Sequence, residues 1–121
     1  MSWALRSGRA WSSPIGMLVH DTTGLWLSFR GALLIPSKLD LPQPTPKPCD
    51  TCADKPCLSA CPVGALSGAG YDLPTCHAYL DTSKGADCMT NGCNVRRSCP
   101  AGADYARAAE QSAYHMRQFH K

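Results

Sequence analysis

The chain has 121 residues, which is enough for one small domain or for a domain with an appendage. Twelve lysines and arginines stand against nine acidic residues, and a formal charge of +3 is too small to predict binding to nucleic acid. The longest nearly apolar stretch, residues 25–35, contains Arg30 and is too short for a membrane-spanning helix. Eight cysteines are too many to be incidental, so they are the feature that must explain the function.

The opening of the chain is basic and poor in acidic residues, as in targeting segments, and its first acidic residue is Asp21. Its apolar part, residues 15–19, is shorter than the roughly 7–15 residues of a signal-peptide core. We therefore expect no export and a cytoplasmic location. Disulfides do not persist in that reducing compartment, and clustered thiols there usually hold metal.

Residues 1–40 contain no cysteine and predict an N-terminal β extension. Two short apolar runs, 15–20 and 25–29, flank a turn sequence that contains glycine, so we expect them to form a hairpin. Residues 32–35 are a candidate third strand. We expect nothing N-terminal of these runs to pair with them. Their apolar side chains must then cover the cysteine-rich part of the chain or dock on a partner or a second copy.

Residues 41–48 predict a connector, because proline occupies every second position from Pro42 to the end of this segment. Proline there prevents a helix and removes ladder donors, which leaves an extended polyproline-like chain. Residues 49–121 then form the cysteine-rich domain, and we expect it to end in a helix. Apolar residues spaced three or four apart form one stripe of that helix: Tyr105, Ala109, Ala113, Met116 and Phe119.

Four of the cysteines form the pattern C-x2-C-x4-C-x3-C-P over residues 49–62. Three closely spaced thiolates can surround one face of an iron–sulfur cluster, whereas the cysteine before proline points away. In two-cluster ferredoxins that fourth cysteine ligates the other cluster. A second Cys-Pro pair at 99–100 follows three further cysteines. Eight cysteines thus supply two four-thiolate sites with none left over.

Other metal chemistry stays open as an alternative. Four-thiolate zinc sites usually contain two matched C-x2-C pairs, and this chain has one. A zinc-bound structural module is therefore the less favoured interpretation, and a disulfide framework is disfavoured by the expected reducing compartment. His77 is a candidate replacement ligand beside Cys76, but the eight cysteines already fill both sites. Arg96 and Arg97 lie between the last two cysteines. Three interpretations of this pair stay open: it forms a solvated face, it raises the reduction potential of a cluster, or it docks an acidic partner.

Residues 49–100 resemble a bacterial-type dicluster [4Fe-4S] ferredoxin module, and residues 57–66 are similar to its CPxGA(I/L) segment. A longer resemblance, over residues 14–100, is to the ferredoxin portion of the epoxyqueuosine reductase family. In that family an isolated cysteine precedes a tyrosine by three residues, as Cys76 does here, and a Gly-Cys pair precedes the last Cys-Pro, as at Cys93. The middle cysteine of the family's last motif is missing here, and Cys88 takes its place.

The resemblance and the crossover rule imply a set of ligands for two [4Fe-4S] clusters. Site one takes Cys49, Cys52, Cys57 and Cys99, and site two takes Cys61, Cys76, Cys88 and Cys93. Asp72 and Pro74 predict the start of a short helix that carries Cys76 into site two.

The implied fold is α+β, a small ferredoxin-like dicluster module with an N-terminal β-hairpin extension and a C-terminal helix. The implied function is electron transfer to a redox partner, a reductase or dehydrogenase, by a carrier without catalytic residues or a substrate site of its own. The alternative is an electron-relay fragment or subunit of a corrinoid-dependent or other reductase. Too few residues precede Ile15 for the family's corrinoid-binding domain, so we do not expect this chain to reduce epoxyqueuosine alone.

Overall fold

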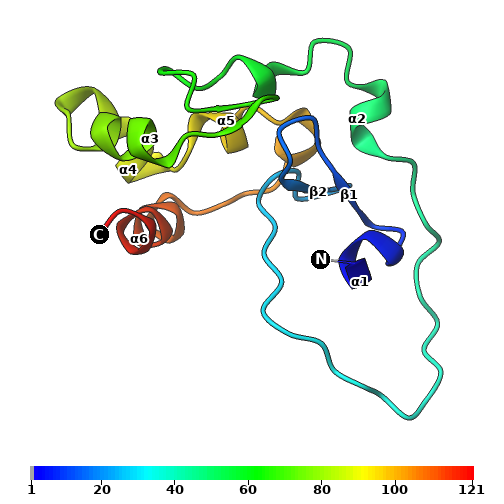
Figure 1. The fold of residues 1–121 in the computed structure, drawn as a ribbon. Coiled ribbons are helices and arrows are strands. Elements are labelled where there is room, and N and C mark those ends of the chain that lie inside the picture. The colour runs from blue at the N-terminus through cyan, green and yellow to red at the C-terminus, as the bar shows by residue number, and fades with distance from the viewer. Residues whose placement is uncertain (1) are drawn as a thin grey trace.

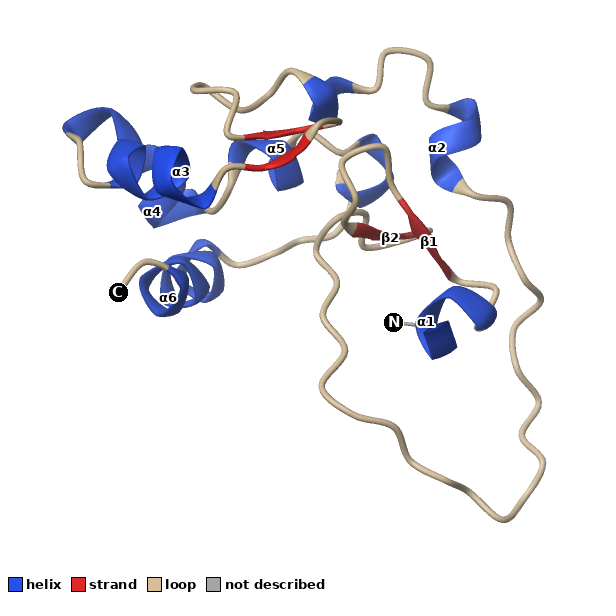
Figure 2. Ribbon diagram, viewed as in Figure 1, coloured by secondary structure: helices blue, strands red, loops and turns tan. Residues whose placement is uncertain are grey.

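The computed structural model describes residues 2–121, and its architecture is α+β, with short helices and two small antiparallel sheets (Figure 2). In chain order the elements are α1 (Ser2–Arg6), β1 (Ala10–Ser12), β2 (Leu18–His20), α2 (Pro48–Thr51), η1 (Pro56–Leu58), β3 (Leu66–Ser67), β4 (Gly70–Tyr71), α3 (Leu73–Leu80), η2 (Ser83–Gly85), α4 (Ala86–Asn91), α5 (Asn94–Arg97), η3 (Pro100–Gly102) and α6 (Ala109–Phe119). The η elements are single turns of 3-10 helix.

The first sheet pairs β2 with β1, and Trp11 lies opposite Val19. The expected hairpin between residues 15–20 and 25–29 was therefore wrong in its partner, because the strand that pairs lies N-terminal. The predicted turn does form, since the backbones of His20 and Gly24 bond to each other in both directions. That tight turn directs the following residue into the core, so no second strand continues from it.

Residues 26–47 have no regular secondary structure and run as a long excursion away from the rest of the chain (Figure 1). The candidate strand at 32–35 is not formed, because no neighbouring strand accompanies it. Leu33 and Leu34 are 91% and 100% exposed there. Prolines at alternate positions return the chain to the body at α2.

The second half of the chain consists of short helices joined by tight turns. Asp72 caps α3, because its side chain accepts a hydrogen bond of 3.1 Å from the backbone N–H of Thr75, as its place before Pro74 predicts. The C-terminal helix was expected from residue 101 onward, with an apolar stripe that starts at Tyr105, but α6 begins only at Ala109, after η3 and an irregular segment. It packs against α4 (Figure 1).

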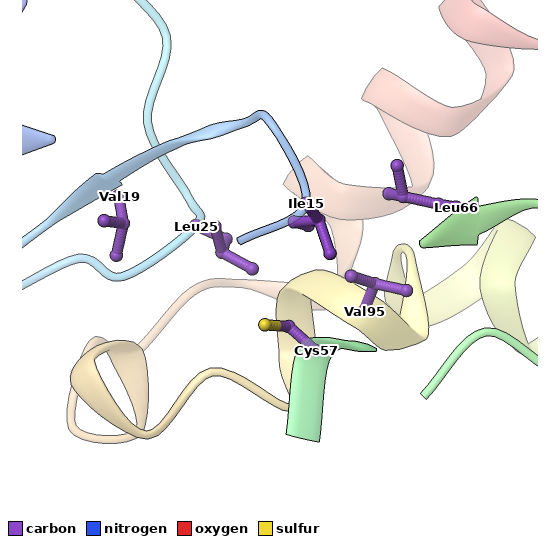
Figure 3. Packing of buried hydrophobic residues seen from close by; sticks show 6 residues of the cluster. All are labelled: Ile15, Val19, Leu25, Cys57, Leu66 and Val95. Carbon is purple, nitrogen blue, oxygen red and sulfur yellow. The ribbon is translucent and has the colours of Figure 1, made fainter. Parts of the chain in front are cut away.

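The core joins the N-terminal extension to the cysteine-rich part. Figure 3 shows its six buried members, which are Ile15, Val19, Leu25, Cys57, Leu66 and Val95. Half of them precede the long excursion and half follow it, so the first apolar residues of the extension cover the cysteine-rich part. In the described residues, 2–121, no helix has both the length and the apolarity needed to cross a membrane.

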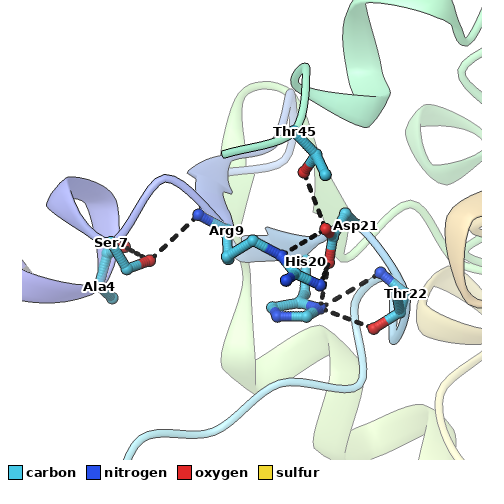
Figure 4. Close-up of polar contacts among 7 residues, drawn as sticks. All are labelled: Ala4, Ser7, Arg9, His20, Asp21, Thr22 and Thr45. Carbon is cyan, nitrogen blue, oxygen red and sulfur yellow. Dashed lines mark hydrogen bonds and ion pairs between the residues drawn. The ribbon is translucent and has the colours of Figure 1, made fainter. Parts of the chain in front are cut away.

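A polar cluster fastens the excursion where it returns (Figure 4). The Arg9 guanidinium donates to Asp21 at 3.0 Å, and the Thr45 hydroxyl donates to the same carboxylate at 2.8 Å. The backbone N–H of Thr45 also donates to the carbonyl of Gly8. The hydrogen bond from Arg9 is the main reason that the pKa of Asp21 lies below its usual value.

Candidate metal centres

The eight cysteines line two separate cavities, four to each. A cavity of about 370 Å³ is lined by Cys49, Cys52, Cys57 and Cys99, and we call it site one. A cavity of about 330 Å³ is lined by Cys61, Cys76, Cys88 and Cys93, and we call it site two. All eight are free cysteines.

Short helical turns that begin with proline build site one. Pro48 opens α2, which contains Cys49. Pro56 opens η1 and directly precedes Cys57. Pro100 opens η3 and directly follows Cys99. Proline suits the first position of a helical turn because the N–H that it lacks has no partner there. Each proline thus fixes the backbone direction beside a cysteine and leaves no backbone N–H of its own without a partner.

The N-terminal extension forms one wall of site one at the turn after β2. Gly24 has a φ of +55°, and a Cβ there would lie 2.7 Å from the backbone nitrogen of Gly102 and 3.1 Å from the Sγ of Cys99. Any side chain would therefore collide with η3 and strain the backbone. The turn and the last Cys-Pro segment are in direct contact although the whole cysteine pattern separates them in sequence.

Helices rather than loops build most of site two. Cys76 lies in α3, Cys88 in α4, and Cys93 at the residue before α5. Cys61 reaches this cavity from the loop after η1, so it leaves its three sequence neighbours at site one. The bend between α4 and α5 is made by Gly92, whose φ is +90° and where a Cβ would lie 2.7 Å from the Trp26 ring.

Site two also contains a tyrosine that binds one of its cysteines. The hydroxyl of Tyr71, the last residue of β4, donates to the Sγ of Cys76 at 3.4 Å. Burial, and then this hydrogen bond, raise the pKa of Tyr71 far above its usual value, so the hydroxyl keeps its proton. Sequence reasoning missed this residue, and its only signal was its position just before the helix cap.

Two partly buried arginines line site two. Arg96 donates to the backbone carbonyl of Leu25 at 2.7 Å, and Arg107 donates to the Ser112 hydroxyl at 3.0 Å. The Arg107 guanidinium also lies over Trp26, 4.5 Å from the ring centroid. Burial is the main cause that lowers the pKa of both arginines, yet each stays charged at neutral pH.

The adjacent pair Arg96 and Arg97, which the sequence presents as one unit, is divided by the structure. Arg97 is exposed and forms an ion pair with Asp87, whereas its neighbour faces the cavity. Successive helical residues differ by about 100° in direction, which explains the division. The available signal was the spacing of three from Cys93, which places Arg96 on the cysteine's side of α5.

Burial also affects the thiols themselves. It is the leading cause that raises the pKa of Cys49, Cys57, Cys76 and Cys88 above the usual value. Without metal these thiols hold their protons at neutral pH, so metal binding must release them. Among residues 2–121, no three side chains of His, Cys, Asp or Glu converge closely enough to hold a metal ion. Metal ligation by the eight cysteines stays a prediction.

His77, the candidate replacement ligand, lies in a different contact. Its Nδ1 is 2.7 Å from the Nδ1 of His120, and its ring stacks on Phe119 at 4.8 Å between centroids. His120 in turn contacts Asp81 at 2.9 Å. His77 is not among the residues that line either cavity, and it joins the end of α6 to α3.

Comparison with known proteins relates the chain to epoxyqueuosine reductase. The chain is 37% identical over 79 residues to the epoxyqueuosine reductase of Gloeobacter violaceus. The match covers 64% of this chain and 24% of the reductase, so the matched part is about a quarter of that relative's length. No protein-family model matches the chain. No solved structure is significantly similar to it.

Proposed function

We propose that the chain is an iron–sulfur electron-transfer protein that binds two [4Fe-4S] clusters, one in each cavity. The observation that supports this most directly is the division of eight free cysteines into two cavities with four thiols each. Four thiolates are the usual protein ligands of such a cluster. The same division is the one that the crossover rule gives for the Cys-Pro pattern.

The space and the donor atoms of the cavities fit this group. Among residues 2–121 no three ligand side chains lie close enough to hold a single ion, and each cavity exceeds 300 Å³, so each site has space for a group larger than one ion. A group of four iron and four sulfide atoms makes use of that space. Thiolates are the soft ligands that iron–sulfur clusters select.

The chain's own residues would hold the group and exclude water from it. Val19 and Leu25 line site one, and Leu66 and Val95 line site two, so apolar side chains surround the thiols in both cavities. When bound, each cluster accepts and returns one electron. The polypeptide supplies thiolates, a dry wall and charged or hydrogen-bonding groups that adjust the potential.

The similarity to epoxyqueuosine reductase favours a second candidate within the same chemistry. The match covers about a quarter of that relative, so the chain is similar to one part of that reductase. In this version the chain is the electron relay of a corrinoid-dependent or other reductase whose catalytic domain lies elsewhere. In the first version its partner is a separate reductase or dehydrogenase, and in both versions electron transfer is the role of the cysteine-rich part.

The decisive experiment is a metal and sulfide analysis of the chain purified without oxygen. We expect about eight iron and eight acid-labile sulfide atoms per chain, with the broad visible absorption of iron–sulfur clusters. Two zinc ions, no sulfide and a colourless protein would refute the proposal. Four iron and four sulfide atoms would show that only one of the two cavities binds a cluster.

A further inference from the structure

We infer that site two has the higher reduction potential, so that an electron given to the doubly loaded chain resides there. This inference rests on the proposed function, because it requires a cluster in each cavity. It adds a direction to that function: transfer between the two sites runs from site one to site two. The reasons are the charges and hydrogen bonds around the two cavities.

Positive charge without a compensating acid lines site two. Arg96 and Arg107 are both partly buried there, and the exposed Arg30 also contributes to the lining. No aspartate or glutamate is among the residues that line this cavity. Hydrogen bonds to Leu25 and Ser112 hold the two partly buried guanidinium groups in place. A charge in such surroundings is screened less than an exposed one, so it acts on the cavity over a longer distance.

The charges around site one offset one another in large part. Asp21 lines this cavity, but Arg9 neutralises it through a direct ion pair at 2.5 Å. Lys55 also lines it, and that side chain is exposed and therefore screened by water. Beside Cys49, the exposed carboxylate of Asp50 opposes only part of the positive charge of the partly buried Lys47. Site one therefore has fewer partly buried positive charges than site two, because Lys47 is the one that remains and it is not among the residues that line the cavity.

A hydrogen bond acts in the same direction as the charges. The Tyr71 hydroxyl donates to the Sγ of Cys76 in site two, and no side-chain hydroxyl donates to a cysteine of site one in the described residues. Reduction adds one negative charge to a cluster and its thiolates. Positive charges and hydrogen bonds to sulfur favour the more negative form, and both are known determinants of cluster potential.

The step is a transfer of one electron and involves no bond or proton. A one-electron reductant such as dithionite loses an electron, and the oxidised group at one site gains it. If reduction first occurs at site one, the electron passes to site two, which leaves site one oxidised again. At equilibrium the singly reduced chain then holds its electron beside Arg96 and Arg107.

The test is a redox titration of the loaded chain with dithionite, followed by EPR spectroscopy. The wild-type chain should show two transitions, and we compare it with Arg96→Gln and Arg107→Gln. Each substitution should shift the higher transition to lower potential and leave the lower one in place. Arg96→Lys and Arg107→Lys keep the charge and should leave both transitions near their wild-type positions. Arg97→Gln, on the exposed side of α5 and paired with Asp87, is the matched control and should shift the higher transition less than either of the partly buried variants.

Three results would overturn the inference while the proposed function stands. One is that the glutamine variants shift only the lower transition, and another is that they shift neither. The third is that the lysine variants shift the higher transition as much as the glutamine variants do, which would show a packing effect. If one glutamine variant does not fold, the other arginine provides the same test from a different element. Absence of iron and sulfide from the wild-type chain would refute the proposed function itself and the inference with it.

Discussion

Site one and site two differ in how far the chain must travel to complete them. Three cysteines of site one lie within residues 49–57, and one more arrives from beyond α5. The cysteines of site two are spread over residues 61–93 and lie on or beside separate helices. Site one therefore depends on three short helical turns and on the N-terminal wall, whereas site two depends on the packing of α3, α4 and α5. Cys61 lies next in sequence to the cysteines of site one but lines site two, and Cys99 follows the cysteines of site two but lines site one. The two sites therefore depend on each other for their structure.

Replacing Cys61 or Cys99 should have the largest effect, because each substitution should remove the cluster of one site only. Cys61→Ala should remove about half of the iron and the transition that responds to Arg96→Gln, because this cysteine lines site two. Cys99→Ala should remove the other transition. Iron analysis and EPR spectroscopy measure both effects, and Cys52→Ala is the control that should match Cys99→Ala. Loss of the same transition in Cys61→Ala and Cys52→Ala would contradict the assignment.

Glycine substitutions should damage one site each without removing a ligand. Gly24→Ala places a Cβ 2.7 Å from η3, and its positive φ adds about 1–3 kcal/mol of strain, so we expect a lower thermal midpoint and less iron at site one. Gly92→Ala should have the same effect at site two, where its Cβ would meet Trp26. Circular dichroism and iron analysis provide the measurements.

Gly16→Ala is the matched control for these two variants. Its φ is +75°, but no atom lies within 4 Å of an added Cβ, so only backbone strain should appear. A Gly24→Ala chain as stable and as rich in iron as Gly16→Ala would show that the turn and the last Cys-Pro segment are not in firm contact.

The polar cluster beside site one should contribute stability that site two does not have. Asp21→Asn weakens the bond to Arg9, and we expect it to lower the free energy of unfolding by about 2 kcal/mol at pH 7. Because the folded state lowers the pKa of Asp21, this stability is present above the usual pKa of 3.8 and is lost as the pH falls through the folded value. Thr45→Val, which removes one hydrogen bond, should lower the free energy of unfolding by about 1 kcal/mol. Denaturant unfolding at neutral and acidic pH tests this, and equal losses at both would contradict it.

The smallest effect concerns a property that the two sites share. In each cavity one buried and one partly buried thiol have a pKa raised above the usual 9.0, so the folded metal-free chain binds their protons more tightly than the unfolded chain does. Their contribution to stability is complete below about pH 9 and is lost as the pH rises through the folded values. We expect the denaturant midpoint of the chelated chain to fall between about pH 8 and about pH 10, whereas that of the loaded chain should not. Parallel curves for the two forms would contradict this.

Local rules predicted those parts of the fold that short sequences determine. The cap at Asp72 and the turn before Gly24 both formed, because neighbouring residues supply their hydrogen bonds. Strand pairing was not predictable in the same way, because β1 offers only three residues and no clear alternation. The C-terminal helix begins later than its apolar stripe suggests, since η3 and the segment after it precede Ala109.

In the candidate sites too, features set by neighbouring residues were predictable from the sequence, whereas contacts between distant segments were not. Cysteine spacing predicts ligand sets because loops of two to four residues limit where each sulfur lies. Spacing says little about the groups that surround those sulfurs. Arg107 lines site two only because the segment before α6 crosses Trp26, and the N-terminal wall of site one comes from a turn far away in sequence. Such contacts follow from packing between distant segments.

The long excursion over residues 26–47 makes the N-terminal segment act as a tethered ligand of the cysteine-rich part. The excursion connects Leu25 in the core to α2 of the cysteine-rich part, so its length sets the effective concentration of the N-terminal segment. Loop-closure entropy changes slowly with length, and doubling the excursion would weaken this association by only about 0.6 kcal/mol. Insertions there should therefore be tolerated. A cut within the excursion would make the association of the two pieces depend on protein concentration. The wall of site one would then form only at concentrations at which the pieces associate.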